Sequence, residues 1–302
     1  MDLKQIEYIV KIADENNITR AAEKLFITQS ALNQQLLKLE KDLGVQLFYR
    51  SRTDWHPTEA GLVYLENARE ILRIKRKTYS ILNDMAESQK GRLSVGFTSG
   101  RGITMFSAVY PDFHRLYPHI IVEPMELSVK KQQELISRGD LDIGFQTLCE
   151  KQKNGNNFIT LMQEEIMLVI PKGHPLGALA APEGQPFASL DLAQLKYEPF
   201  VLMYKESTIR PLVESAFQDA GFIPNVLFET SNNLTIVTMI KSNLCCGLLP
   251  YYYVKNDREG MACFSLPKKL GWEMAVSYRK DGYLSQAARE FIRLAKVFCN
   301  TP

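Results

Sequence analysis

Residues 19–44 read TRAAEKLFITQSALNQQLLKLEKDLG, and this stretch decides the fold of the N-terminal part of the chain. Thr19 is a suitable N-cap for a short helix over 20–25, and Thr28 for a second helix over 29–42. Gly44 is expected to end the second helix in a left-handed cap. The inward stripe of that helix is predicted to be Ala31, Leu32, Leu36 and Leu39. The pattern therefore predicts two helices joined by a short turn.

The outward face of the second helix has the side chains that base recognition requires. Gln29, Asn33 and Gln34 carry amides that can read an adenine edge in the major groove. A strand, a turn and a second strand are expected over 47–57, where Arg50 and Arg52 are placed to meet phosphate or the minor groove. The predicted DNA-binding residues are Thr28, Gln29, Ser30, Asn33, Gln34, Lys38, Arg50 and Arg52.

Charge alone does not select DNA as the partner. Residues 1–60 hold eight Lys and Arg against nine Asp and Glu, a net charge of −1. DNA binding must then rely on local clustering of Lys38, Arg50 and Arg52 with helix N-termini. Periodicity by itself is equally compatible with a helical packing domain.

The composition is that of an ordinary globular protein. The chain has 302 residues, 45% hydrophobic and 23% charged, with a net charge of +2, which suits about two domains. The five cysteines and four histidines are scattered, so we expect no metal site and no cofactor. The charged N-terminus and the short apolar runs predict neither a secretory signal nor a membrane span, hence a cytoplasmic protein.

Beyond residue 58 the predicted secondary structure changes twice along the chain. Residues 59–88 predict one long helix that is apolar on two adjacent faces, with Lys75 on one seam. One face would pack on the N-terminal domain and the other on a second copy of the chain, unless both pack within the chain. From residue 92 onward strands and helices alternate, which favours parallel-dominated sheets in two lobes joined by two crossing strands, with a cleft between them.

The cleft has a candidate anion site. Ser99 and Gly100 lie where a predicted strand ends and a helix begins, so free backbone N–H groups favour an anion. Arg101 is placed to pair with a ligand carboxylate. The alternative is that Ser99 and Ser128 only cap helices.

Several segments of the sequence form a recognisable set: Ala21-Ala22-Glu23-Lys24-Leu25, Gln29-Ser30-Ala31-Leu32, Leu39 to Gly44, Leu47 to Arg50 and Thr58 to Gly61, followed by Gly139 to Gly144 and Gly247 to Pro250. In this order and at this spacing they resemble the LysR-type transcriptional regulators. The resemblance covers essentially the whole chain. It implies a fold that is α/β overall, with a winged helix-turn-helix domain (1–58), a linker and dimerisation helix (59–88) and a two-lobed effector-binding domain of periplasmic-binding-protein type (92–302). Lobe I would span about 92–162 and 269–302, and lobe II about 163–268.

The resemblance also implies the function and the sites. The expected protein is a sequence-specific regulator that binds a pseudo-palindromic double-stranded DNA site as a dimer and tetramer, responds to a small and favourably anionic effector, and has no enzymatic activity. The implied effector-binding residues are Ser99, Gly100, Arg101, Ser128, Thr147, Tyr204, Thr208, Leu249 and Pro250. Four residues depart from those usual in the family: Asn33, Gln34, Thr53 and Pro57. These departures affect which operator sequence is recognised and the geometry expected for the wing, the predicted strand-turn-strand over 47–57.

Other functions stay open at this stage. The C-terminal two hundred residues alone would suit a solute-binding protein, and a constitutive DNA-binding protein with a vestigial cleft is a third reading. A thiol switch among Cys149, Cys245 and Cys246 is considered, although the adjacent pair lies in an apolar run typical of inert buried thiols. Nucleophile-elbow, zinc-protease and Walker motifs are missing from the sequence, which argues against catalysis.

Overall fold

The structure is a computed structural model that describes residues 2–50, 55–86, 90–182 and 184–300. The chain divides into two compact units, the first holding residues 1–88 with 138–140, the second the remainder. Each unit is built around its own buried apolar cluster or clusters.

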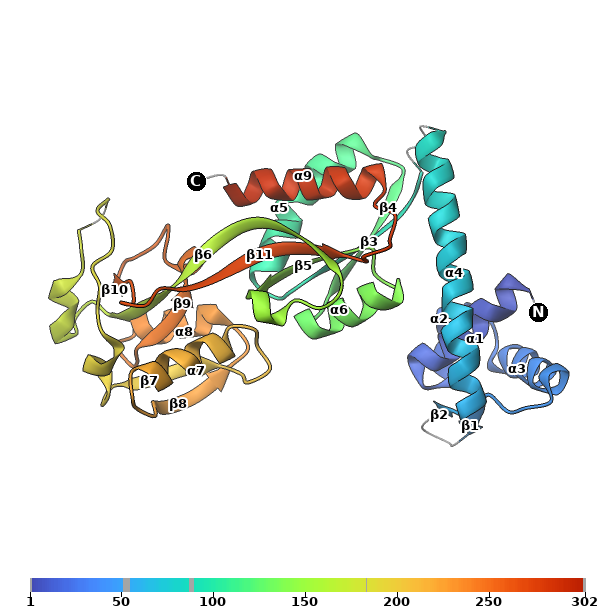
Figure 1. Cartoon of the computed structure of the whole chain (residues 1–302), viewed down its shortest axis with the longest axis horizontal. Coiled ribbons are helices and arrows are strands. Elements are labelled where there is room, and N and C mark those ends of the chain that lie inside the picture. Colours follow the sequence, from blue (N-terminus) through green and yellow to red (C-terminus); the bar gives the residue numbers. More distant parts are fainter. Residues whose placement is uncertain (1, 51–54, 87–89, 183, 301–302) are drawn as a thin grey trace. The chain divides into compact units, whose positions relative to one another are not determined.

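The first unit is helical with one short hairpin (Figure 1). Its elements are α1 (Leu3–Glu15), α2 (Ile18–Lys24), α3 (Gln29–Leu43), β1 (Phe48–Arg50), β2 (Trp55–Pro57) and α4 (Glu59–Met85). β1 and β2 pair antiparallel, as the strand-turn-strand prediction required. The predicted end of the long helix near residue 88 lies outside the described residues.

Two details of the predicted helices are wrong. The cap of α2 is Asn17 rather than Thr19, because the helix starts at the buried Ile18 and the Asn17 Oδ1 accepts the amides of Thr19 and Arg20 at 2.9 and 3.0 Å. Ala31 is exposed, since a step of 100° per residue turns it away from the stripe of Leu32, Leu36 and Leu39. The cap of α3, Thr28, is confirmed, as is Gly44 at φ 71°, and the structure shows Thr58 as the cap of α4.

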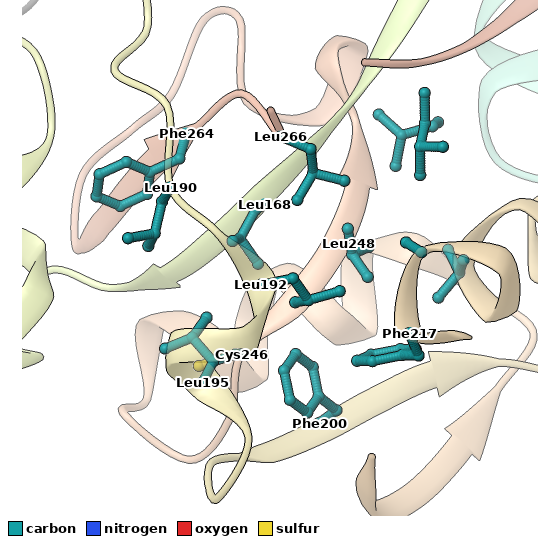
Figure 2. Close-up of a cluster of buried hydrophobic side chains, with 14 of the residues drawn as sticks. Leu168, Leu190, Leu192, Leu195, Phe200, Phe217, Cys246, Leu248, Phe264 and Leu266 are labelled. Atoms are coloured by element: carbon teal, nitrogen blue, oxygen red, sulfur yellow. The ribbon is translucent and has the colours of Figure 1, made fainter. Parts of the chain in front are cut away.

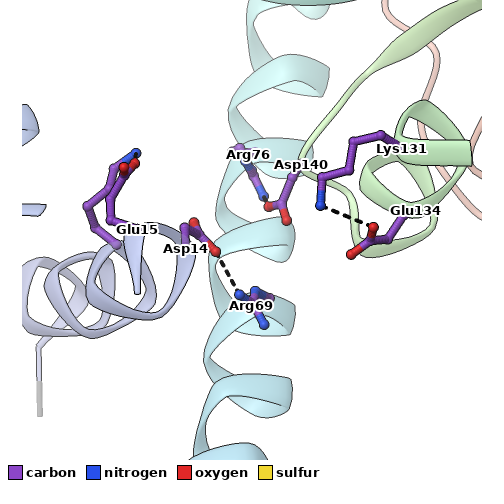
Figure 3. A network of polar contacts seen from close by, with 8 residues as sticks. Asp14, Glu15, Arg69, Arg76, Lys131, Glu134 and Asp140 are labelled. Atoms are coloured by element: carbon purple, nitrogen blue, oxygen red, sulfur yellow. Dashed lines mark hydrogen bonds and ion pairs between the residues drawn. The ribbon is translucent and has the colours of Figure 1, made fainter. Parts of the chain in front are cut away.

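Close packing ties the start of α4 to the rest of the first unit. Leu65 and Ala68 enter the cluster formed by α1 and α3. A Cβ added at Gly61 would lie 2.0 Å from the Leu47 carbonyl oxygen, so the close approach requires glycine. The Arg69 side chain donates to Asp14 Oδ1 at 2.7 Å, which links α4 to α1 (Figure 3).

The second unit contains a mixed sheet and a separate pair of parallel strands. Its strands are β3 (Gly91–Phe97), β4 (Ile120–Glu126), β5 (Ile143–Leu148), β6 (Asn157–Pro171), β7 (Pro199–Met203), β8 (Asn225–Thr230), β9 (Gly247–Pro250), β10 (Met261–Phe264) and β11 (Leu270–Tyr278). Its α-helices are α5 (Arg101–Leu116), α6 (Val129–Arg138), α7 (Arg210–Asp219), α8 (Asn233–Lys241) and α9 (Gln286–Asn300). Short 3₁₀ turns lie at Glu150–Gln152, Pro175–Leu179, Leu192–Leu195 and Tyr251–Tyr253.

The expected parallel dominance is only partly correct. β3 pairs parallel with β4 and β5, and β7 with β8. The described residues join β10, β6, β11, β5, β3 and β4 in that order into one sheet, with β9 added to β6, and every pair involving β6 or β11 is antiparallel. The reason is that the chain leaves through β6 and returns through β11, so two crossing strands side by side must run in opposite directions (Figure 1).

Separate apolar clusters lie along these two strands. One includes Leu93, Phe145 and Phe291 and extends to Met162 and Met274, and we call the part around it lobe I. Another includes Leu168, Phe200 and Phe264 and extends to Ile166 and Trp272, and we call the part around it lobe II (Figure 2). A further cluster in lobe II packs α8 on the other side of β6.

Candidate functional site

The exposed face of α3 is the first candidate site. Thr28 lies at the N-cap, where its hydroxyl accepts the Ala31 amide at 3.2 Å. Gln29, Ser30, Gln34 and Lys38 are exposed and Asn33 is half-buried. The Gln29 Oε1 accepts a hydrogen bond from the Thr19 hydroxyl at 3.0 Å, and the N–H₂ group of this exposed side chain is left as a donor.

The wing arginine has a partner within its own domain. Arg50 forms an ion pair with Glu40, whose side chain is only 6% exposed, and its guanidinium lies 5.9 Å from the Trp55 ring centroid. Glu40 also accepts the Leu47 amide at 2.8 Å, so this carboxylate anchors the hairpin to α3. The positive charge of Arg50 is therefore partly neutralised by Glu40 and helps to stabilise the fold. Arg52, the other predicted wing contact, lies outside the described residues.

The second candidate site is a cavity of about 250 Å³ between lobe I and lobe II of the second unit. Four loops line it, and each of them lies directly before a helix. Six of the nine predicted effector residues line it, namely Ser99, Gly100, Arg101, Ser128, Thr147 and Thr208. The other residues that line it are Thr98, Leu127, Val129, Met203, Glu206, Ser207, Ile209, Ser231, Asn232, Asn233, Tyr253 and Trp272.

Helix N-termini give the cavity its electrostatic character. Residues at or just before the starts of α5, α6, α7 and α8 all line it. The first amides of a helix have no partner within the helix and carry partial positive charge, so four such ends at one cavity favour a negative ligand group. At two of these ends a side chain takes one amide: Ser128 accepts from Lys131 at 3.3 Å and Asn232 from Leu234 at 2.9 Å.

Ser99 does not cap a helix. The N-cap of α5 is Gly100, which has a φ of 70° and supplies no side chain, so the capping reading holds for Ser128 and fails for Ser99. A residue with a side chain would be strained at this φ. Gly100 therefore exposes the amides at the start of α5 to the cavity.

Arg101 lines the cavity, but its charge is already paired. It forms an ion pair with Glu164, whose side chain is fully buried, and lies 4.4 Å over the Tyr252 ring. Glu164 also accepts from the Trp272 indole at 3.0 Å and from the Tyr252 amide at 2.6 Å. The prediction that Arg101 pairs with a ligand carboxylate is therefore corrected, because a carboxylate of its own chain holds it.

Thr147 and Thr208 contact each other across the cavity. The Thr208 hydroxyl donates to the Thr147 carbonyl oxygen at 2.7 Å, and the Gln152 amide donates to the Thr208 carbonyl oxygen at 2.9 Å. Two hydrogen bonds thus join the end of β5 and the turn after it to the segment before α7. The Thr208 hydroxyl proton is used by the protein itself.

Three predicted effector residues do not line this cavity in the described structure. Leu249 and Pro250 are buried on β9, where they pair with Met167 and Ile166 of β6. Tyr204 is 47% exposed and follows β7 outside the cavity lining. The segment of Ser231, Asn232 and Asn233 was missed, although it joins β8 to the start of α8 as Ser99 and Gly100 join β3 to α5.

The adjacent thiols are poor candidates for a switch. Burial raises the pKa of Cys245 to about 11 and that of Cys246 to about 12, so the reactive thiolate is scarce near neutral pH. In the ranges the structure describes, no group of three His, Cys, Asp or Glu is arranged to hold a metal ion. No described helix has both the length and the apolar composition of a membrane span.

Comparisons with known proteins match both units. The family model described as "LysR substrate binding domain" matches residues 86–299, and "Bacterial regulatory helix-turn-helix protein, lysR family" matches residues 3–62. The uncharacterized HTH-type transcriptional regulator YwbI of Bacillus subtilis is 31% identical over 304 residues, covering 100% of this chain and 98% of its own. The Hca operon transcriptional activator HcaR of Escherichia coli is 26% identical, covering 98% of this chain and 97% of its own.

Solved structures agree on the fold. Full-length OxyR from Pseudomonas aeruginosa superposes with a TM-score of 0.71 at 22% identity, covering 98% of this chain and 97% of its own. Full-length CbnR in complex with its target DNA has a TM-score of 0.60 at 20% identity, covering 98% and 99%. At these identities the likeness concerns the architecture of the chain.

Proposed function

The chain belongs to the LysR family of transcriptional regulators, and from that premise we propose that it reads a specific DNA site with α3 and responds to a small anionic effector between lobes I and II. The family's helix-turn-helix domain binds DNA and its substrate-binding domain takes the effector. The observation that carries the proposal is the convergence of four helix N-termini on one cavity in a chain that also exposes a polar face on α3.

For DNA, we propose Gln29, Ser30, Asn33 and Gln34 as base-edge contacts and Thr28, Lys38, Arg50 and Arg52 as backbone contacts. The outward amides of α3 support base reading, since a bidentate amide matches the adenine edge in the major groove. With Arg50 shared with Glu40, phosphate binding depends more on Lys38 and on helix N-terminal amides.

For assembly, we propose the division 1–58, 59–88 and 92–302, with α4 pairing two copies so that two α3 helices meet a pseudo-palindromic site. Ile74, Tyr79, Leu82 and Met85 are exposed apolar side chains on the C-terminal half of α4, which supports pairing there. Lys75 forms an ion pair with Glu7 of α1 at 2.8 Å, so this polar residue packs within the chain. We also propose that two such dimers associate into a tetramer.

For activity, we propose regulation without catalysis, in the cytoplasm where the DNA lies. The effector would bias the relative orientation of the lobes and so the spacing of paired α3 helices. This account needs a ligand with different affinities for the two orientations.

The test is fluorescence anisotropy of the full chain on the duplex upstream of its own gene, at two salt concentrations. Gln29→Ala should weaken binding about 5- to 150-fold if its amide reads a base, on the usual value of such a contact. Gln35→Ala is the matched control, since Gln35 is exposed on another side of the same helix. Equal binding to a scrambled duplex, or equal loss in both variants, would contradict base reading by α3.

A further inference from the structure

The cavity has little cationic charge available to a ligand. Among the described residues that line it, Arg101 is the one Lys or Arg, and Glu164 neutralises it. Glu206 adds a carboxylate to the lining, for which the structure records no ion pair in the described part of the chain. A second negative charge on the ligand would therefore face Glu206 without a counter-charge, which disfavours dicarboxylates and phosphates.

The same cavity has hydrogen-bond acceptors that nothing in the described residues satisfies. Asn233 is 9% exposed and its Oδ1 has no partner, and the buried Ser207 Oγ has none either. The Asn233 Oδ1 is an amide oxygen and can only accept, so a donor on a ligand would satisfy it.

Unsatisfied buried acceptors are costly, so they favour a ligand that brings a hydrogen-bond donor. Asn233 Oδ1, Ser207 Oγ and the Glu206 carboxylate all belong to lobe II, on the loop before α7 and at the first residue of α8. An ammonium group has three donors and a positive charge, which suits two neutral acceptors and one carboxylate. The amides before α5 and α6, at Gly100 and Ser128, belong to lobe I and suit a carboxylate.

The size and the remaining lining restrict the ligand further. A cavity of about 250 Å³ is below the usual range of ~300–1,000 Å³ for drug-sized ligands. Leu127, Val129, Met203 and Ile209 supply apolar contacts in it. A short aliphatic side chain fits this space.

We propose that the effector is a small α-amino acid, whose carboxylate binds the helix N-termini of lobe I and whose ammonium group binds Asn233, Ser207 and Glu206 of lobe II. This inference rests on the proposed function of the cavity as the effector site. A zwitterion of this kind bridges the two lobes, so its binding stabilises the arrangement in which both halves contact it.

The experiment is isothermal titration calorimetry of the full-length protein with the twenty L-amino acids. Each amino acid that binds is compared with its α-hydroxy and des-amino analogues, and glutarate serves as a dicarboxylate. We expect binding by at least one aliphatic amino acid, and about a tenfold or greater loss when the ammonium group is removed. Equal or tighter binding by the des-amino acid or by glutarate overturns the proposal, as does no binding across the panel.

Two variants test the residues. Glu206→Gln and Asn233→Leu should each weaken amino-acid binding about tenfold or more, whereas Lys205→Gln, next to the cavity lining, should not. Glu206 is exposed, so its variant is expected to fold even if Asn233→Leu does not. Amino-acid binding that neither variant changes overturns the assignment. DNA-binding anisotropy on the same samples separates the amino-acid proposal from the proposed DNA-binding function. If no amino acid binds but DNA binding is intact, the amino-acid proposal fails and the proposed DNA-binding function stands.

Discussion

Replacing Glu164 by Gln should destabilise the second unit strongly. Glu164 is fully buried on β6 and holds Arg101, the Trp272 indole and the Tyr252 amide at once. Glutamine keeps the shape and can still accept from one donor, but it leaves the Arg101 guanidinium, 8% exposed, without a counter-charge. Breaking one partner of a buried ion pair costs about 3–5 kcal/mol.

The magnitude converts to a melting temperature. For a unit of this size about 1 kcal/mol shifts Tm by roughly 2–4 °C, so Glu164→Gln should lower it by about 6–20 °C. Tryptophan fluorescence is a direct assay because Trp272 donates to Glu164. The control is Asp219→Asn, which breaks the exposed pair with Lys268 and should cost at most about 1 kcal/mol.

A double variant isolates the orphaned charge. Arg101→Met in the Glu164→Gln background removes the unpaired guanidinium, so the double variant should melt above the single one. The reasoning is refuted if Glu164→Gln shifts Tm no more than Asp219→Asn does. That result would mean that solvent, rather than Glu164, stabilises the Arg101 charge.

Three further outcomes are expected. Thr28→Ala should lower the stability of the first unit by about 1 kcal/mol because the Ala31 amide loses its acceptor, while Ser30→Ala leaves it unchanged, as thermal melts would report. Cys245, with a pKa raised by burial to about 11, should resist iodoacetamide in the native protein and react only on unfolding, as read by mass spectrometry. Burial acts to raise the pKa of Glu273, but the bonds to Lys153 and Thr160 outweigh it, so this pKa is lowered. The stability that the ionised carboxylate contributes is present above pH 4.5 and is lost as the pH falls further. Glu273→Gln should therefore flatten the acid side of a curve of Tm against pH.

Much of the helical part is predictable from local chemistry. A cap residue, its helix and the terminal glycine lie within one short stretch, so Thr28, α3 and Gly44 follow from the sequence. Strand lengths are harder, since β6 extends from Asn157 to Pro171 while its uninterrupted apolar run covers only 166–170. Its first half carries polar residues and is a strand because β11 pairs with it over its length.

Local sequence chemistry also predicted part of the candidate cavity. Ser99 and Gly100 were found because a strand followed by a helix puts free amides at the join, whereas Ser128 was implied by the family resemblance. The same reasoning applied to Ser231, Asn232 and Asn233 would have found the lobe II wall. Leu249 and Pro250 could not be placed in this way, because their burial depends on pairing with β6.

The sequence by itself determined the order of the elements, the polar face of α3 and the family, since helix periodicity, capping and the recurring phrases are properties of neighbouring residues. The tertiary structure alone decided which charges remain available. Arg101 meets Glu164, and Thr208 meets Thr147, across more than sixty positions of the chain. No local pattern contains such a pairing, because it depends on which distant segments the fold brings into one buried space, where low dielectric makes every unpaired charge costly.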